Sequence, residues 1–168
     1  MVRETARLRL RRLSGGDAEF ICELLQEPAF LLYIGDKGIR TVDDARRYIA
    51  DGPVASYSRF GFGLYAVETK DAGAPVGMCG LLKRESLDDP DLGFAFLERF
   101  WSNGYALESA AEVMDHARRD CGLRRVLAIT APDNRSSLRL LGKLGFRFER
   151  MIRMPGSDAE TRLFSNES

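Results

Sequence analysis

Apolar residues recur along this chain at two spacings, one typical of strands and one typical of helices. Strand-like alternation begins at Leu8 and Leu10, set between arginines. Later β-rich segments cover 62–69, 76–82 and 92–97, and the turn sequence DAGAP separates the first two of them. Short strand-like segments joined by turns predict an antiparallel meander in the middle of the chain.

Helical spacing marks the stretch that precedes this meander. Residues 20–25 place four apolar side chains on one face, and Pro28 is expected to end that helix. The glycine-punctuated segment 29–40 is expected to be a loop or an irregular helix. Segment 41–44, Thr-Val-Asp-Asp, has the form of a capping box and predicts a short helix closed by the Gly-Pro pair at 52–53.

Helices and strands alternate in the second half of the chain. A longer helix is predicted over 104–121 with Gly122 as its cap, and Asn134 opens another helix that ends at Gly145. The remaining strands are expected at 126–130, 146–152 and 161–164. The predicted order is strand, two helices, three strands, helix, strand, helix, two strands, which indicates one mixed α/β domain over residues 1–168.

Composition and charge exclude several classes of protein. The 168 residues carry 25 Lys and Arg against 25 Asp and Glu, so a generic binder of polyanions such as nucleic acid is disfavoured. A hydrophobic content of 45% argues against disorder. The amino-terminal residues lack the apolar run of a signal peptide, and no apolar stretch approaches the roughly 20 residues that span a bilayer.

Cysteine and histidine usage limits the chemistry further. The three cysteines, Cys22, Cys79 and Cys121, form no C-x-x-C pair and are expected to be reduced thiols of a cytoplasmic protein without a metal site. A Ser-His-Asp or Cys-His relay would need the single histidine, His116. That residue is predicted to be a solvated surface histidine, because it projects opposite an apolar stripe on its helix. The stripe consists of Leu107, Ala110, Ala111, Met114, Ala117 and Cys121.

Two junctions between a strand and a helix carry candidate chemistry. The first, 96–108, ends a strand, turns through a polar segment containing Gly104 and begins a helix. The amides at a helix start lack partners inside the helix and favour phosphate, and a glycine lets the phosphate approach closely. Neither a P-loop nor a G-x-G-x-x-G motif is present. The second junction, 131–146, combines a helix cap with serines in the first turn.

Together these segments resemble one family. The octapeptide 101–108, WSNGYALE, is similar to the W-G-K-G-Y-A-x-E loop of the branch of the GNAT superfamily that contains the ribosomal-protein N-terminal acetyltransferases. Asn134 and Ser137, with Leu-Gly-Phe at 144–146, resemble the N-x-x-S and L-G-F signature of that branch, and 91–94, DLGF, resembles its preceding strand. The chain departs from the superfamily pattern at three places. They are Trp101 in the usual Arg or Gln position, Ser102 and Asn103 for Gly and Lys, and Ser137 where many members have Tyr.

The resemblance implies a GNAT-like acyl-CoA N-acyltransferase fold and direct transfer of an acetyl group from acetyl-CoA to a primary amine, with no acyl-enzyme and no metal. The pantetheine arm is expected to add along strand 94–97, whose N–H groups also supply an oxyanion donor. The acceptor is a protein N-terminus or a small amine, and a homodimer is implied by the resemblance alone. The residues expected to bind the cofactor are Phe96, Leu97, Trp101, Ser102, Asn103, Gly104, Tyr105, Ala106 and Asn134.

Catalytic and acceptor residues are less sharply defined by the pattern. Ser137 is a candidate to protonate or stabilise the departing thiolate, and its alternative role is that of a simple helix-start hydroxyl. Glu85 and Asp91 are candidates for the base that deprotonates the amine; a water chain or a purely structural role is the alternative for both. Glu108 is interpreted as structural. Phe30 and Tyr33 are expected to form walls of the acceptor site.

Two other readings of the sequence stay open. An acyl-CoA-binding sensor without turnover would show the same phosphate-binding loop beside an incomplete acid and base. A nucleic-acid module using the arginine-rich second half is a third reading, and no helix-turn-helix or aromatic platform supports it.

The neutral total hides an uneven distribution of charge. Residues 71–115 have nine acidic and three basic side chains, whereas residues 118–153 have ten basic and three acidic ones. This separation suits an anionic cofactor on the basic side and a cationic amine on the acidic side. Chance segregation of solvated charges is the alternative explanation.

Overall fold

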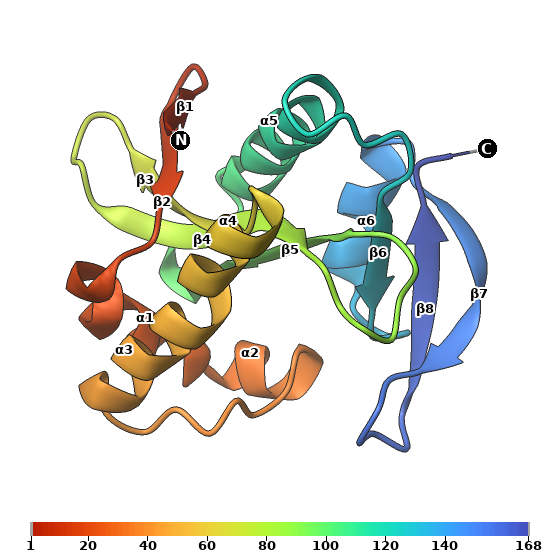
Figure 1. Cartoon of the computed structure of the whole chain (residues 1–168), viewed down its shortest axis with the longest axis horizontal. Helices are drawn as coiled ribbons and strands as arrows, with labels where there is room; N and C mark the ends of the chain where they lie inside the picture. The colour runs from red at the N-terminus through yellow and green to blue at the C-terminus, as the bar shows by residue number, and fades with distance from the viewer. Residues whose placement is uncertain (1, 168) are drawn as a thin grey trace.

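The computed structural model describes residues 2–167, and within them one sheet of eight strands runs through the molecule (Figure 1). Its strand order is β1-β2-β3-β4-β5-β6-β8-β7, antiparallel throughout except between β5 and β6. The strands are β1 (Val2–Glu4), β2 (Leu8–Arg12), β3 (Leu64–Thr69), β4 (Pro75–Leu82), β5 (Asp91–Phe96), β6 (Leu127–Thr130), β7 (Arg147–Arg153) and β8 (Glu160–Ser165).

Helices cover both faces of this sheet (Figure 1). They are α1 (Ala18–Leu25), α2 (Pro28–Tyr33), α3 (Val42–Ile49), α4 (Ala55–Phe60), α5 (Tyr105–Arg119) and α6 (Arg135–Lys143). Successive strand residues point to opposite faces. Tyr65 and Val67 of β3 therefore pack in the core beneath α5 and α6, and Leu64 and Ala66 pack in the core beneath α1 and α3. The two largest hydrophobic cores therefore lie on opposite sides of the sheet.

The predicted mixed α/β architecture is confirmed, with additions at the amino-terminal end. The structure adds the short strand β1, which pairs with β2 as a hairpin. Pro28 follows the end of α1 and is the first residue of α2, a position that suits a residue without an N–H. Helix α2 lies in the segment that is expected from the sequence to be a loop or an irregular helix.

The predicted end at 52–53 of the helix that the capping box opens, α3 in the structure, is wrong. The capping box at Thr41 and Asp44 forms as expected, with the Asp44 amide donating to the Thr41 hydroxyl at 3.0 Å. The chain then stays helical through a π-helical turn, Ala50–Val54, that contains the buried Pro53, and α4 continues to Gly61. The wider π turn accommodates the proline without ending the helical path, and Gly61, with φ of 80°, supplies the left-handed stop.

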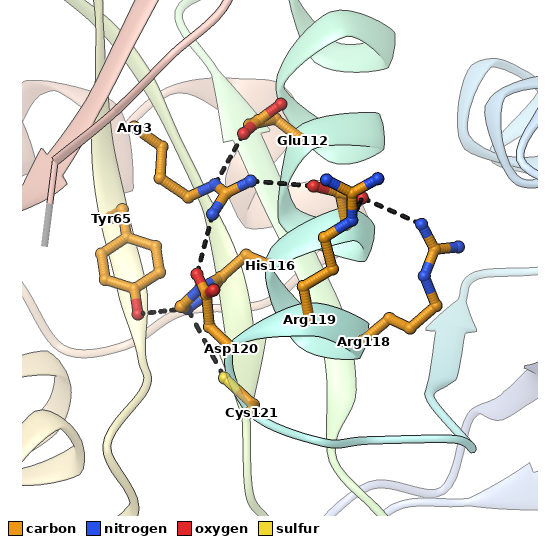
Figure 2. A network of polar contacts seen from close by, with 9 residues as sticks. Arg3, Tyr65, Glu112, His116, Arg118, Arg119, Asp120 and Cys121 are labelled. Carbon is orange, nitrogen blue, oxygen red and sulfur yellow. Dashed lines mark hydrogen bonds and ion pairs between the residues drawn. The ribbon is translucent and has the colours of Figure 1, made fainter.

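The prediction of a solvated His116 is also wrong. The side chain is only 4% exposed, and α5 buries Ser109, Ala110, Val113 and Ala117 on the same face. The inward face is thus rotated from the predicted stripe, whose Ala111 is exposed. Burial is tolerated because both ring nitrogens have partners. One nitrogen, Nε2, lies 3.0 Å from the Tyr65 hydroxyl, and Nδ1 lies 2.8 Å from Asp120 Oδ2 (Figure 2).

A cluster of ion pairs joins this histidine to the first strand (Figure 2). Arg3 of β1 donates from its three guanidinium nitrogens to Glu112 (2.6 Å), Asp115 (2.9 Å) and Asp120 (2.7 Å) on or just after α5. Asp120 therefore accepts from Arg3 and contacts His116 with the same oxygen. This contact set, together with Glu108 bound to Thr5 and Arg7, fixes the amino-terminal hairpin to α5, in line with the structural role expected for Glu108.

We expect His116→Ala to lower the free energy of unfolding by about 2–4 kcal/mol, because it opens a cavity and leaves the buried Tyr65 hydroxyl without its ring partner. Urea denaturation followed by circular dichroism measures this change. Arg118→Ala is the matched control on the same helix, because Arg118 is exposed, and its effect should stay within about 0.5 kcal/mol. Equal effects of the two substitutions would contradict a structural role for the histidine.

Candidate active site

A cleft with a volume of about 1840 Å³ connects the two junctions that the sequence singled out. Strand β5 and the start of α5 form one part of its wall, and the β6–α6 junction forms another. The segment from α2 to α4 and the turn between β7 and β8 complete the lining. The cleft therefore has a half near α5 and α6 and a half near α2 and α3.

The opening arises where β5 and β6 separate. Within residues 2–167, their parallel register consists of the single pair Asp91 and Leu127. The Leu97 N–H donates to Val76 of β4 at 3.0 Å, and main-chain groups alternate in direction along a strand. The N–H groups of Phe94 and Phe96 therefore point away from β4, toward the gap. Strand β5 thus presents main-chain donors to the cleft, as an added extended chain would require.

The turn before α5 is shaped to bind an anion. Ser102 and Gly104 have φ angles of 65° and 80°, which fold the chain back at the start of the helix. The first main-chain bond across the helix start runs from Glu108 N–H to Gly104 C=O at 3.1 Å, so the amides of 105–107 have no partner inside the helix. Unpaired amides and the helix dipole favour a phosphate at this position.

Side chains within this turn hold its conformation. The Trp101 indole Nε1 donates to the Phe96 carbonyl at 2.8 Å, and the Asn103 side-chain amide donates to the Phe100 carbonyl at 2.9 Å. Trp101 stands where the superfamily pattern has Arg or Gln, and Asn103 stands where the pattern of the branch has Lys. Their polar groups are used inside the turn, which stabilises the left-handed Ser102 in the place where the related pattern has a glycine.

The second junction adds a polar cap and a row of cations. The side-chain oxygen of Asn134, Oδ1, accepts from the Ser137 main-chain amide at 3.3 Å. This bond caps α6 as predicted and leaves the side-chain NH₂ group of Asn134 available. Arg135, Arg139 and Lys143 recur every fourth residue of α6, and all three line the cleft. This half of the cleft therefore offers positive charge beside the amides of the α5 turn.

The other half of the cleft contains the buried carboxylate of Asp91. Its side chain is 1% exposed, and Oδ1 accepts from Arg84 Nε at 3.0 Å. The second oxygen, Oδ2, is buried and has no hydrogen-bond partner in the described structure. Burial raises the pKa of Asp91 to about 6 against the opposing effect of Arg84. A buried carboxylate with one unpaired oxygen and a pKa near neutrality is a candidate general base.

Most of the residues that the sequence predicted for the site line this cleft. They are Phe30, Tyr33, Asp91, Phe96, Trp101, Ser102, Gly104, Tyr105, Ala106, Asn134 and Ser137. Leu97 and Asn103 do not line it: Leu97 is fully buried in the core beneath α1 and α3, and the Asn103 amide closes the turn. Glu85 lies exposed on the loop between β4 and β5, outside the cleft lining.

Three polar residues in the half of the cleft near α2 and α3 are not among those predicted from the sequence. Lys37 follows α2, Tyr48 lies on α3 and Arg84 follows β4. Burial lowers the pKa of Lys37, and the charge of Arg84 lowers it further. Burial raises the pKa of Tyr48, and the charge of Arg84 opposes that rise. No local spacing distinguishes these residues from solvated ones, so only the tertiary arrangement brings them to the site.

The acidic stretch 71–115 does not supply its surplus charge to this cleft. Glu108 binds Arg7, and Glu112 and Asp115 bind Arg3, all at the amino-terminal hairpin. The expectation of an acidic surface that receives a cationic amine is therefore corrected for these residues. Of the acids in that stretch, Asp91 is the one that lines the cleft.

Two further observations concern metal ligands and membrane-spanning helices within residues 2–167. No group of three or more His, Cys, Asp or Glu side chains is placed to hold a metal ion in this part of the chain. None of the described helices has the length and apolar character needed to cross a membrane.

Comparisons with known proteins agree with this geometry. The family model described as "Acetyltransferase (GNAT) domain" matches residues 7–147, so the chain belongs to the GNAT acetyltransferase family and is an acetyltransferase. The uncharacterized N-acetyltransferase YoaA of Bacillus subtilis is 27% identical over 168 residues, covering 96% of this chain and 94% of YoaA.

Solved structures of acetyltransferases share the fold. An acetyltransferase from Agrobacterium tumefaciens superposes with a TM-score of 0.84 at 22% identity, covering 100% of this chain and 95% of that one. RimL, the ribosomal L7/L12 α-N-protein acetyltransferase, solved in complex with coenzyme A, superposes with a TM-score of 0.83 at 15% identity, covering 98% of this chain and 97% of RimL. These structures show the shared fold, and the family model over residues 7–147 confirms the recognition of the family from the two junctions.

Proposed function

We propose that this protein transfers an acetyl group from acetyl-CoA directly to a primary amine, on a protein N-terminus or a small molecule. The observation that carries the proposal is Asp91, a buried carboxylate with one unpaired oxygen that lines the same cleft as the anion-binding turn of α5. A base and a phosphate-binding turn in one cleft are what transfer from a CoA thioester to an ammonium group requires.

The cleft residues fit an acyl-CoA. The amides of 105–107 and the NH₂ group of Asn134 would hold the pyrophosphate, and Arg135, Arg139 and Lys143 would neutralise phosphate charge. The donors of Phe94 and Phe96 would hydrogen-bond the extended pantetheine arm. Bound in this way, acetyl-CoA supplies the activated thioester carbonyl that the amine attacks.

Each catalytic side chain then has a defined task. Asp91 accepts a proton from the acceptor ammonium through its unpaired Oδ2, which leaves a nucleophilic amine. An N–H of Phe94 or Phe96 stabilises the negative charge that develops on the thioester oxygen, a contribution of roughly 3–4 kcal/mol for such a donor. The Ser137 hydroxyl, at the start of α6 and in the cleft lining, would hydrogen-bond the departing thiolate.

The proposal is tested by thiol release from acetyl-CoA over a panel of peptides with varied N-termini and small amines. Release of free thiol in proportion to an acetylated amine, identified by mass spectrometry, is the expected result. Binding of acetyl-CoA without release across the whole panel would instead support the alternative of an acyl-CoA sensor.

We expect Asn134→Ala to weaken acetyl-CoA binding several-fold in calorimetry, because it removes both the NH₂ donors and the cap of α6. Asn134→Ser is the matched variant, since a serine oxygen still caps the helix and provides no amide. Weakening in both variants assigns the effect to the NH₂ group. Unchanged affinity in both would remove Asn134 from the cofactor site.

We expect Ser137→Ala to lower kcat several-fold and to change KM less, because the hydroxyl acts on the leaving group during transfer. The neighbouring exposed Ser136 provides the control substitution Ser136→Ala, which should leave kcat within twofold of the wild type. An unaltered kcat in Ser137→Ala would contradict a catalytic role, and Ser137 would then be only a hydroxyl at the start of the helix.

A further inference from the structure

The acceptor half of the cleft holds two cations that the proposed transfer of a simple amine does not use. Lys37 lies in the loop after α2, and Arg84 follows the last residues of β4. Both line the same cleft as Asp91, and Arg84 contacts Asp91 directly. An amine enters such a site as an ammonium ion, and like charges in one cleft repel each other. We therefore expect the acceptor to carry a negative charge that offsets the positive charges of Lys37 and Arg84.

Lys37 has no anionic partner within the described structure. None of the carboxylates of residues 2–167 lies within 4.0 Å of its ammonium nitrogen. The adjacent Asp36 is instead bound to Arg40, with contacts of 2.6 Å and 3.0 Å. Lys37 is an exposed residue, and partial burial together with the charge of Arg84 lowers its pKa. Its ammonium group is thus near Arg84 and unneutralised.

Arg84 is only partly neutralised. Its Nε donates to Asp91 Oδ1 at 3.0 Å, and its two terminal nitrogens make no hydrogen bond within residues 2–167. The planar end of a guanidinium matches a carboxylate in a two-point geometry. Arg84 can therefore hold Asp91 with one edge and present the rest of its fork to a ligand.

Neighbouring charges do not cancel this pair. Lys83 adds a third positive charge, and its ammonium group donates to the main-chain carbonyls of Arg84 and Leu87. The carboxylates of Glu27, Asp51 and Glu160 also line the cleft, and none of them forms an ion pair with Lys37 or Arg84 in the described structure. The Lys37 ammonium group and the two terminal nitrogens of Arg84 are therefore left without a carboxylate partner within residues 2–167, in the same cleft as one buried base.

We propose that the acceptor is an amine that also carries a carboxylate, and that Lys37 and Arg84 bind this carboxylate while the amine faces Asp91. The inference rests on the proposed acetyl transfer and narrows its substrate class. Free amino acids and peptides with an acidic residue next to the N-terminus share this chemistry. The apolar walls of Phe30 and Tyr33 would enclose the remainder of the acceptor.

Matched acceptors test the proposal. One pair of peptides differs only by Asp or Asn next to an N-terminal alanine, a second pair by Glu or Gln, and a third pair compares an amino acid with its amide. We expect kcat/KM to be about tenfold or more higher for the acidic member of at least one pair. The peptide pairs and the amino-acid pair distinguish the two sources of the carboxylate.

Substitution of Lys37 assigns any such preference to the site. We expect Lys37→Gln to reduce the ratio of acidic to neutral kcat/KM to within about twofold of one. Lys70→Gln is the matched control, because Lys70 follows β3 outside the cleft lining, and it should keep the wild-type ratio. A ratio near one in the wild type, or one that Lys37→Gln leaves unchanged, would overturn the proposal.

A binding measurement separates this inference from the proposed function. Calorimetry with N-acetylated peptides of the same pairs needs no turnover, and the acidic member should bind more tightly in the wild type alone. If no amine is acetylated and this Lys37-dependent binding persists, the catalytic proposal fails and the carboxylate site stands. If amines are acetylated and acidic and neutral peptides bind equally, the carboxylate site fails and the catalytic proposal stands.

Discussion

Asp91→Asn is expected to lower kcat/KM for acetyl transfer by about 10²–10⁴-fold, the range typical of a lost general base. Asparagine preserves the size of the side chain and can still accept from Arg84 Nε, but its amide cannot accept the proton from the ammonium group. Steady-state thiol release with the preferred amine measures the loss. Binding of acetyl-CoA should remain within a few-fold, since the cofactor half of the cleft is unaltered.

The pH dependence follows from the raised pKa of Asp91. Because that pKa is about 6, the carboxyl is mostly protonated at pH 5 and cannot act as a base, and it is mostly ionised at pH 7. The wild-type rate should therefore rise with pH through about 6. The Asp91→Asn rate should lack this step, and any residual rate should follow deprotonation of the free amine instead.

Two carboxylates near Asp91 in sequence provide comparisons. Asp89→Asn makes the same change at a residue outside the cleft that binds Arg125, and its kcat/KM should stay within twofold of the wild type. Glu85→Gln tests the second base candidate of the sequence, which the structure places on an exposed loop. A large loss in Glu85→Gln with an active Asp91→Asn would exchange their roles.

Gly80→Ala is expected to destabilise the fold by more than about 4 kcal/mol. A Cβ atom at Gly80 of β4 would overlap the Gly63 carbonyl oxygen and lie 2.7 Å from Leu64 Cα. Both are main-chain atoms at the start of the paired strand β3. Relief of the clash would separate two central strands, since no flexible side chain can move aside. Thermal or urea unfolding measures the change in stability.

Gly142→Ala is the matched control for this substitution. The helical Gly142 of α6 has open space where the methyl group of an alanine would lie, so alanine should stabilise the protein by about 0.5–1 kcal/mol through its better helix propensity. Opposite signs for the same chemical change would identify close strand packing as the cause at Gly80. Similar small effects at both positions would contradict the close approach of β3 and β4.

Elements governed by neighbouring residues could be predicted from the sequence. The cap of Asn134 on α6 and the box formed by Thr41 and Asp44 depend on residues three positions apart, and both form as predicted. The α5 turn likewise depends on a local glycine, Gly104, with a positive φ. Gly104 and Asn134 belong to the short segments on which the resemblance to the family rests.

Features set by tertiary contacts could not be predicted in the same way. His116 is buried because Tyr65 and Asp120 satisfy its ring, and those partners come from another strand and from the end of the helix. Pro53 ends no helix because a π turn absorbs it. Lys37 and Arg84 lie in loops, so their proximity depends on how two distant connections meet over the sheet. Charge type alone did not distinguish them from surface residues.

The single register pair between β5 and β6 has a consequence for stability. The strand order of the sheet is unbroken, but β5 and β6 are joined by few main-chain hydrogen bonds. An extended molecule that hydrogen-bonds to β5 inside the gap replaces part of the missing pairing. Because such a molecule binds only the folded chain, its affinity adds directly to the free energy of unfolding, by about 2.7 kcal/mol at a concentration one hundred times its Kd. Cofactor supply and persistence of the folded enzyme are therefore one linked equilibrium.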